Sequence, residues 1–123
     1  MNKIRMIALA ACMAATLDAS AQEQEIRLFS HRGGRMEHDE NTLSAFQASY
    51  DAGYRGFETD IRMTRDGALV ITHDSSLERT TDGTGTVEEK TEAEIRRLRT
   101  KQGNKVLFLD ELLEFLEGKE GLY

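Results

Sequence analysis

The sequence predicts an α/β fold. Three short runs of apolar and β-branched residues are typical of strands, and a run with apolar residues at helical spacing separates the first strand from the second. Each strand run stops at a polar cluster, and ligands of open α/β sheets bind beyond the carboxyl ends of the strands. The order of the elements therefore predicts strands and helices that carry a polar site at the strand ends.

The first predicted strand and the helix after it are defined by local signals. Residues 26–30 contain the apolar Ile26, Leu28 and Phe29, of which Ile26 is β-branched, and are followed by a glycine-containing turn. Residues 43–52 have an apolar face, Asn41 or Thr42 can cap the start of the helix, and Gly53 can end it.

The second and third predicted strands leave a topological choice. Residues 56–63 alternate along a strand, and residues 68–72 contain a continuous apolar run, which suits a strand covered on both faces. The Asp66-Gly67 turn between them is too short for a parallel crossover. Either the two strands form a local hairpin, or the second strand ends near Asp60 and the connection takes another path.

The rest of the chain predicts a loop and two short helices. Residues 79–85 are rich in small polar residues, as is typical of a loop. Thr91 can cap a helix that runs to about Leu98, and a last helix over residues 110–116 would end at Gly118.

The first 21 residues have the features of a secretory signal peptide. A basic start at Lys3 and Arg5 precedes a short apolar run, and residues 19–21 (Ala-Ser-Ala) form an A-x-A cleavage pattern. We expect cleavage before Gln22, export to the periplasm or the medium, and a single domain over residues 22–123. The apolar run is too short for a stable membrane span.

A second processing route remains open at residues 9–12 (Leu-Ala-Ala-Cys), which resemble a lipoprotein box. Lipidation of Cys12 would anchor the protein instead of releasing it. Cleavage after Ala21 would remove Cys12, the single cysteine, so we expect neither a disulfide framework nor thiol chemistry in the mature chain. The net charge of −6 argues against a nucleic-acid-binding surface.

Glu58 and Asp60 are candidates for binding a divalent cation. Two residues apart in a strand, their carboxylates project from the same face, about 6–7 Å apart along it. Two hard oxygen ligands suit Mg²⁺ or Ca²⁺. Taken alone, however, the pair is better explained as a solvent-facing pair on an edge strand.

Two histidines and an arginine also follow predicted strands. His31 and Arg32 come after the first strand, and His73 ends the third. A histidine exchanges protons near neutral pH, and an arginine can bind phosphate through two parallel hydrogen bonds. Each residue alone also fits an exposed turn. Together with Glu58 and Asp60 they form a complementary set that fits hydrolysis of a phosphate ester.

The motifs around these residues resemble those of the glycerophosphodiester phosphodiesterases. The resemblance covers about residues 26–113, with the motifs in the expected order and spacing. The sequence departs from the family pattern at Asp39, where a proline usually stands. The matching motifs are His-Arg-Gly at 31–33, Glu-Asn-Thr at 40–42, Glu-Thr-Asp at 58–60, His-Asp at 73–74 and Arg-Thr-Thr-Asp-Gly at 79–83.

The resemblance implies a TIM-type (β/α)₈ barrel. It also implies a divalent metal ion, Ca²⁺ or Mg²⁺, and cleavage of a small glycerophosphodiester to an alcohol and glycerol 3-phosphate. By the motifs, the site residues would be Glu58 and Asp60 as metal ligands, His31 and His73 as general acid and base, Arg32 as the phosphate contact and Glu40 as a further site residue.

The chain of 123 residues is short for such a barrel, which takes about 250 residues. The resemblance therefore implies the N-terminal portion of the barrel, with about three of its eight strands. The family's further acidic metal ligand would lie beyond residue 123. Two alternatives stay open: a truncated, inactive pseudoenzyme or metal- and phosphate-binding module, and a related phospholipase that acts on intact lipids.

Overall fold

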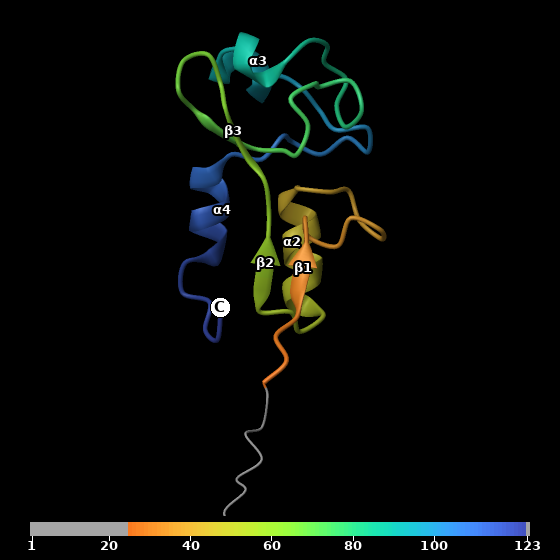
Figure 1. Cartoon of the computed structure of the whole chain (residues 1–123), viewed down its shortest axis with the longest axis vertical. Coiled ribbons are helices and arrows are strands. Elements are labelled where there is room, and N and C mark those ends of the chain that lie inside the picture. The colour runs from red at the N-terminus through yellow and green to blue at the C-terminus, as the bar shows by residue number, and fades with distance from the viewer. Residues whose placement is uncertain (1–24, 123) are drawn as a thin grey trace, which may run out of the picture.

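The computed structural model describes residues 25–122. The expected signal peptide, residues 1–21 with Cys12, lies outside the described residues. Figure 1 shows an elongated molecule whose strands and helices are divided between its two ends. Within residues 25–122, no helix has the length and apolar character that crossing a membrane requires.

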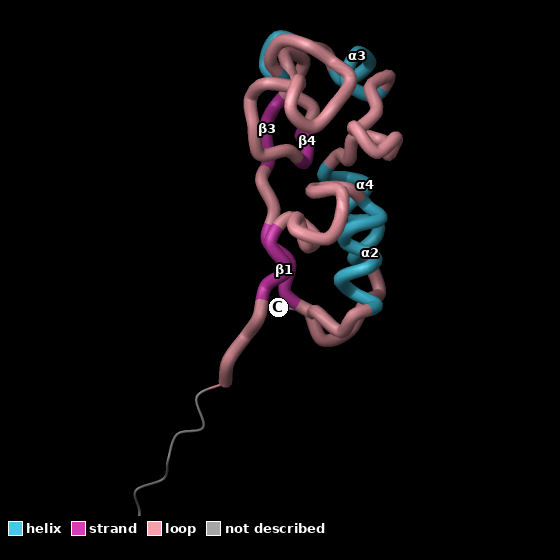
Figure 2. Tube along the Cα trace, turned by 90° about the vertical axis from the view of Figure 1, so that its right-hand side faces the viewer, coloured by secondary structure: helices cyan, strands magenta, loops and turns pink. Residues whose placement is uncertain are grey.

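A strand–helix–strand unit forms one end of the molecule. Strand β1 (Phe29–His31) pairs in parallel with β2 (Gly56–Glu58), and helix α2 (Leu43–Asp51) connects them. A second helix, α4 (Leu109–Leu116), lies beside α2, and both helices cover the same face of the two strands (Figures 1 and 2). The register places His31 opposite Glu58, so two of the predicted site residues meet at the end of this sheet.

Helix α2 begins and ends where its sequence predicts. The Thr42 side chain accepts a hydrogen bond from the backbone N–H of Ala45, which satisfies one of the free donors at the helix start. Gly53 follows the helix with φ +98°, a conformation that glycine adopts without a steric penalty. The buried face carries Phe46, whose ring meets the edge of Phe57 on β2 at 5.9 Å between ring centroids.

The prediction of one strand over residues 56–63 is wrong. Strand β2 ends at Glu58, and after Thr59 and Asp60 the chain enters β3 (Ile61–Met63), which pairs antiparallel with β4 (Leu69–Ile71). The two alternatives therefore combine: the strand ends before Asp60, and a separate hairpin turns at residues 66–67. The chain changes its neighbouring strand at this point. Strand β2 pairs with β1, whereas the Asp60 carbonyl already accepts a hydrogen bond from the N–H of Thr72, the residue after β4.

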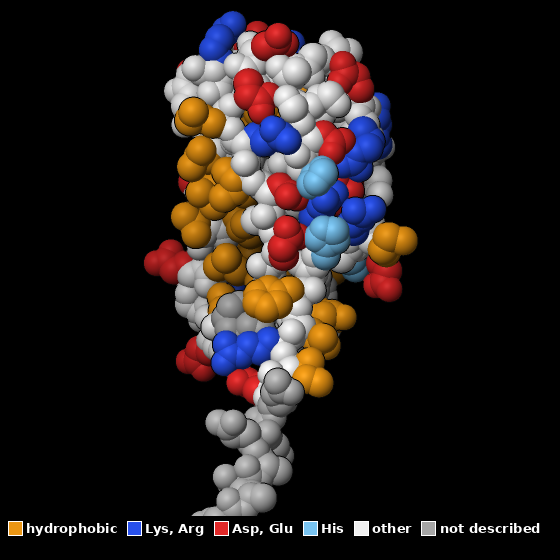
Figure 3. Space-filling view, in the orientation of Figure 1, with side chains coloured by type: hydrophobic (Ala, Val, Ile, Leu, Met, Phe, Trp, Pro, Cys, Tyr) orange, Lys and Arg blue, Asp and Glu red, His pale blue; other side chains and the backbone are white. Residues whose placement is uncertain are grey.

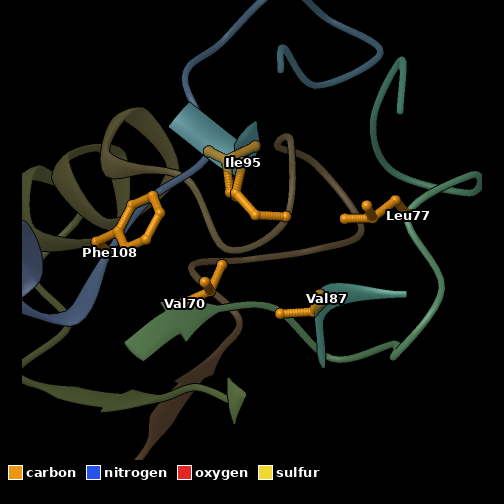
Figure 4. Packing of buried hydrophobic residues seen from close by; sticks show 6 residues of the cluster. Val70, Leu77, Val87, Ile95 and Phe108 are labelled. Carbon is orange, nitrogen blue, oxygen red and sulfur yellow. The ribbon is translucent and has the colours of Figure 1, made fainter. Parts of the chain in front are cut away.

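Strand β4 is covered on both faces at its centre, as predicted. Val70 and Ile71 point to opposite sides, as successive strand residues do, and are 1% and 2% exposed. Val70 belongs to a hydrophobic cluster with Leu77, Val87, Ile95, Val106 and Phe108 (Figure 4). Ile71 belongs to a second cluster with Phe46, Leu107 and Leu112.

The remaining elements surround the Val70 cluster. They are a 3₁₀ turn, η1 (Val87–Glu89), and helix α3 (Glu92–Arg96). Thr91 caps α3 through the Glu94 N–H, and the Glu94 carboxylate accepts from the Thr91 N–H in return, which confirms the predicted cap. The helix stops two residues before Leu98, and residues 79–85 form the predicted loop.

Candidate active site

The turn after β1 has an unusual backbone. Arg32, Gly33 and Gly34 have φ values of +53°, +74° and +87°, so three successive residues are in the left-handed region. A Cβ on Gly33 would lie 2.8 Å from the Ala45 Cβ, so the turn packs directly on the start of α2. The Arg32 N–H donates to the Glu58 carbonyl at 2.9 Å, which joins the turn to the end of β2.

Arg32 is buried between two carboxylates. Its Nε lies 3.1 Å from Asp60 Oδ2, and its Nη1 lies 3.4 Å from Glu40 Oε1. A left-handed conformation at a non-glycine residue costs about 1–3 kcal/mol and persists only where the surroundings impose it. Here the surroundings are the ion pairs and the Asn41 N–H, which donates to the Arg32 carbonyl at 2.9 Å.

Glu58 and Asp60 each present an oxygen that lacks a hydrogen-bond partner. Glu58 Oε2 is 3.6 Å from His31 Nε2, and Asp60 Oδ2 is close enough to Arg32 for an ion pair. Both oxygens are nevertheless buried without a hydrogen-bond partner among the described residues. A buried carboxylate oxygen without a hydrogen bond is costly, and a hard divalent cation is a ligand that suits such an oxygen.

The carboxylates of Glu58 and Asp60 are the kind of oxygen ligand that Ca²⁺ and Mg²⁺ prefer, but two side chains are too few to complete the coordination of either ion. In the described part of the chain, no group of three or more histidine, cysteine, aspartate or glutamate side chains is arranged to hold a metal. Glu58 and Asp60 could therefore hold such an ion only together with water, substrate or further residues. Mg²⁺ commonly binds in this way, through one or two carboxylates.

His73 is held by its neighbour. Its Nδ1 lies 2.7 Å from Asp74 Oδ1, and the other oxygen of Asp74 accepts from Arg79 Nε at 2.5 Å. The hydrogen bond from Arg79, followed by that from His73, holds the pKa of Asp74 well below its usual range. Because the ionised carboxylate can only accept, His73 Nδ1 carries the hydrogen and Nε2 is left for proton exchange.

Arg79 is a site residue that the sequence reasoning missed. Its two terminal nitrogens bind the two oxygens of Glu40 at 2.7 and 3.1 Å, while its Nε binds Asp74. These hydrogen bonds raise the pKa of Arg79, and its hydrogen bond is the main cause of the lowered pKa of Glu40. The available signal was the motif at residues 79–83, but the loop pattern gave no reason to bring it toward Glu40.

All six predicted site residues thus belong to two connected groups. His31 contacts Glu58 across the strand pair, and the other group is a series of alternating charges. Figure 3 shows histidine, basic and acidic side chains gathered near the middle of the face that the helices leave uncovered. The series contains His73, Asp74, Arg79, Glu40, Arg32 and Asp60.

A separate hollow of about 390 Å³ lies beside β1 and α2. Its lining includes His31, Arg35, His38 and Tyr54. It shares His31 with the charged groups but contains none of the carboxylates named above, so the chemistry is located by the ionic contacts and not by this hollow.

The model of the glycerophosphoryl diester phosphodiesterase family matches residues 31–120. The chain belongs to this family. It is 41% identical over 71 residues to a glycerophosphodiester phosphodiesterase of Caldanaerobacter subterraneus, a match that covers 58% of this chain and 29% of that protein. Human glycerophosphodiester phosphodiesterase 1 is 44% identical over 73 residues, with 59% of this chain and 22% of the human protein covered.

Solved structures of family members share this fold. A glycerophosphodiester phosphodiesterase from Agrobacterium tumefaciens superposes with a TM-score of 0.74 at 36% identity, covering 80% of this chain and 46% of that one. A phosphodiesterase from Oleispira antarctica, solved with the product sn-glycerol-3-phosphate, gives 0.70 at 31% identity, covering 74% and 40%. The chain thus spans less than half of each solved relative.

These matches confirm the predicted fold class, part of a (β/α)₈ barrel. Among the described residues, the parallel sheet has two strands, β1 and β2. The third predicted strand, β4, pairs in the separate β3–β4 hairpin, because the chain changes partner after Glu58.

Proposed function

We propose that the protein to which residues 25–122 belong hydrolyses glycerophosphodiesters to an alcohol and glycerol 3-phosphate with the help of Ca²⁺ or Mg²⁺. The observation that carries the proposal is that Glu58 Oε2 and Asp60 Oδ2 are buried without a hydrogen bond and lie 3.6 Å from His31 and 3.1 Å from Arg32. Family membership supports the reaction class, and the product bound to the Oleispira relative supports the substrate class.

The described residues divide the chemistry among them. His73 exchanges a proton through Nε2, because Asp74 occupies Nδ1. His31 is the second acid/base group, and Arg32 supplies positive charge near the phosphate. Glu58 and Asp60 would hold the cation, which when bound stabilises the charge that develops on the phosphoryl oxygens.

The test uses the longest polypeptide that the reading frame expresses. Release of glycerol 3-phosphate from glycerophosphocholine is measured with Ca²⁺, with Mg²⁺ and after EDTA. We expect metal-dependent turnover that EDTA removes and that falls about 10²- to 10⁴-fold in Glu58→Gln and His73→Asn. Glu114→Gln, an exposed carboxylate on α4, is the matched control and keeps full activity. Metal-independent release, or none from the wild type, contradicts the proposal.

A second candidate is a metal- and phosphate-binding module without turnover. The two-stranded parallel sheet and the small donor set of the described residues favour it. Titration calorimetry with Ca²⁺ and Mg²⁺ separates the two, because binding without glycerol 3-phosphate release supports the module. Turnover of intact phospholipids in preference to glycerophosphocholine would instead indicate the phospholipase activity that the sequence left open.

A further inference from the structure

We propose that Arg79 is a positioning residue that holds the His73–Asp74 pair in place relative to the Glu40–Arg32–Asp60 group. This inference rests on the proposed function, because it concerns how the two parts of that site are aligned. Arg79 would not touch the substrate, and its effect on the reaction would pass through Asp74 to His73.

The first support is the geometry of the Arg79 guanidinium. All three of its nitrogens contact carboxylate oxygens, two from Glu40 and one from Asp74. The side chain is 48% exposed, and a single ion pair at that exposure usually contributes little. A planar guanidinium that joins two carboxylates is different, because its fixed fork sets the position of both groups.

The second support is where the partners lie. His73, Asp74 and Arg79 follow β4 and belong to the part of the molecule built around the Val70 cluster. Glu40 belongs to the segment between β1 and α2, 39 residues away along the chain from Arg79. The Arg79–Glu40 contact is therefore a direct ionic link between the two ends of the elongated molecule (Figure 1).

The third support is that the Arg79 turn is itself fixed. Leu77, two residues before Arg79, is 2% exposed in the Val70 cluster. Its carbonyl accepts from both the backbone N–H and the hydroxyl of Thr81, and the Thr80 carbonyl accepts from the Lys101 N–H. Arg79 is thus anchored at its backbone and at its side chain, as a residue that sets the position of another group must be.

The consequence for His73 is chemical. With Asp74 fixed and ionised, the ring keeps its hydrogen on Nδ1 and directs Nε2 away from Asp74. Without Arg79, one Asp74 oxygen loses its partner and the carboxylate is free to rotate. The ring then loses the contact that selects its tautomer and its orientation.

The experiment compares Arg79→Gln and Arg79→Lys with a matched control, Arg96→Gln. Arg96 also contacts three carboxylates, those of Glu92, Asp110 and Glu111. Two readouts are measured on the full polypeptide: the His73 tautomer from ¹⁵N NMR at a pH where the ring is neutral, and kcat and KM for glycerophosphocholine.

We expect both Arg79 variants to raise the fraction of His73 with hydrogen on Nε2 and to lower kcat about 10- to 100-fold with little change in KM. Lysine fails to rescue because an ammonium cannot bind two carboxylates as the guanidinium fork does. Arg96→Gln should leave the tautomer and kcat unchanged.

Several results would overturn the proposal. An unchanged His73 tautomer in Arg79→Gln does so, as does a rise in KM alone, which would indicate direct contact with the phosphate. If Arg79→Gln does not fold, Glu40→Gln, which weakens the anchor of Arg79, must shift the tautomer in the same direction. If the wild type shows no turnover, the proposed function fails while the tautomer measurement still decides the role of Arg79.

Discussion

Glu40 has two arginine partners. Its side chain is 13% exposed, and it binds Arg79 through both oxygens and Arg32 through one. The hydrogen bond from Arg79 is the largest cause of the lowered pKa of Glu40, with the charge of Arg32 adding to it. A folded-state pKa below the unfolded-state value means that the ionised carboxylate stabilises the folded chain.

The pH dependence of stability follows from this sign. The contribution of Glu40 is fully present above its ordinary pKa of 4.5 and is lost as the pH falls through the lowered folded-state value. We expect Glu40→Gln to cost about 1–3 kcal/mol of unfolding free energy near neutral pH, because it weakens charged hydrogen bonds. Its loss of stability on acidification should be smaller than that of the wild type.

Urea unfolding near neutral pH and near pH 3 measures both effects. Glu37→Gln, which changes an exposed carboxylate in the same turn, is the control and should follow the wild-type pH dependence. If the wild type and Glu40→Gln lost the same unfolding free energy on acidification, the contacts of Arg79 and Arg32 with the ionised Glu40 carboxylate would not contribute to stability.

At the scale of elements, the contact between the β1 turn and helix α2 depends on a missing side chain. A Cβ at Gly33 would meet the Ala45 Cβ at 2.8 Å and the backbone at the start of α2 at 3.0 and 3.1 Å. Backbone and Cβ atoms cannot move aside as a flexible side chain can. The close approach of α2 to β1 thus positions Arg32, the residue before Gly33.

We expect Gly33→Ala to lower the unfolding free energy by about 2–4 kcal/mol, the sum of overpacking and a positive φ. Gly67→Ala is a matched control, because Gly67 also has a positive φ of +92° but a Cβ there meets nothing within 4 Å. It should cost only about 1–2 kcal/mol. Thermal or urea unfolding measures the difference, and equal costs for the two variants would refute the steric argument.

Local sequence signals predicted the ends of these elements well. Thr42, Thr91 and Gly53 act through neighbours within a few residues, so their roles can be read from the chain. The change of partner after Glu58 could not be predicted in the same way. The alternating pattern continues through it, and it depends on the hydrogen bond between the distant Asp60 and Thr72.

As with the elements, the sequence predicted the local features of the candidate site but not its long-range contacts. Polar residues after strands identified the carboxylates Glu58 and Asp60 and the histidines, but Arg79 joins the site through a contact with Glu40, 39 residues away along the chain, that only the fold creates. Asp39 is a further example. It stands where the resemblance leads us to expect proline, and its carboxylate accepts from Thr100 Oγ1 and Asn104 Nδ2 at 2.5 and 2.7 Å. No local pattern predicts a contact over 61 residues.

For the whole molecule, we propose that residues 1–21 direct export and are then removed. The basic start, the apolar run and the Ala-Ser-Ala pattern at 19–21 support this. Intact-mass analysis of periplasmic and secreted fractions should find a chain that begins at Gln22, and Ala21→Arg should block the cleavage. A lipid-modified Cys12 would support the anchored alternative, and an unprocessed cytoplasmic chain would refute export.

The two hydrophobic clusters meet back to back on β4, through Val70 and Ile71. Unfolding of β4 would expose both clusters to solvent at the same time. Neither cluster can therefore lose its packing while the other remains intact. We therefore expect the folded state to melt in one cooperative step. A partly unfolded form in which Glu58 and Asp60 stayed in place while His73 moved away from them would have no stable hydrophobic core.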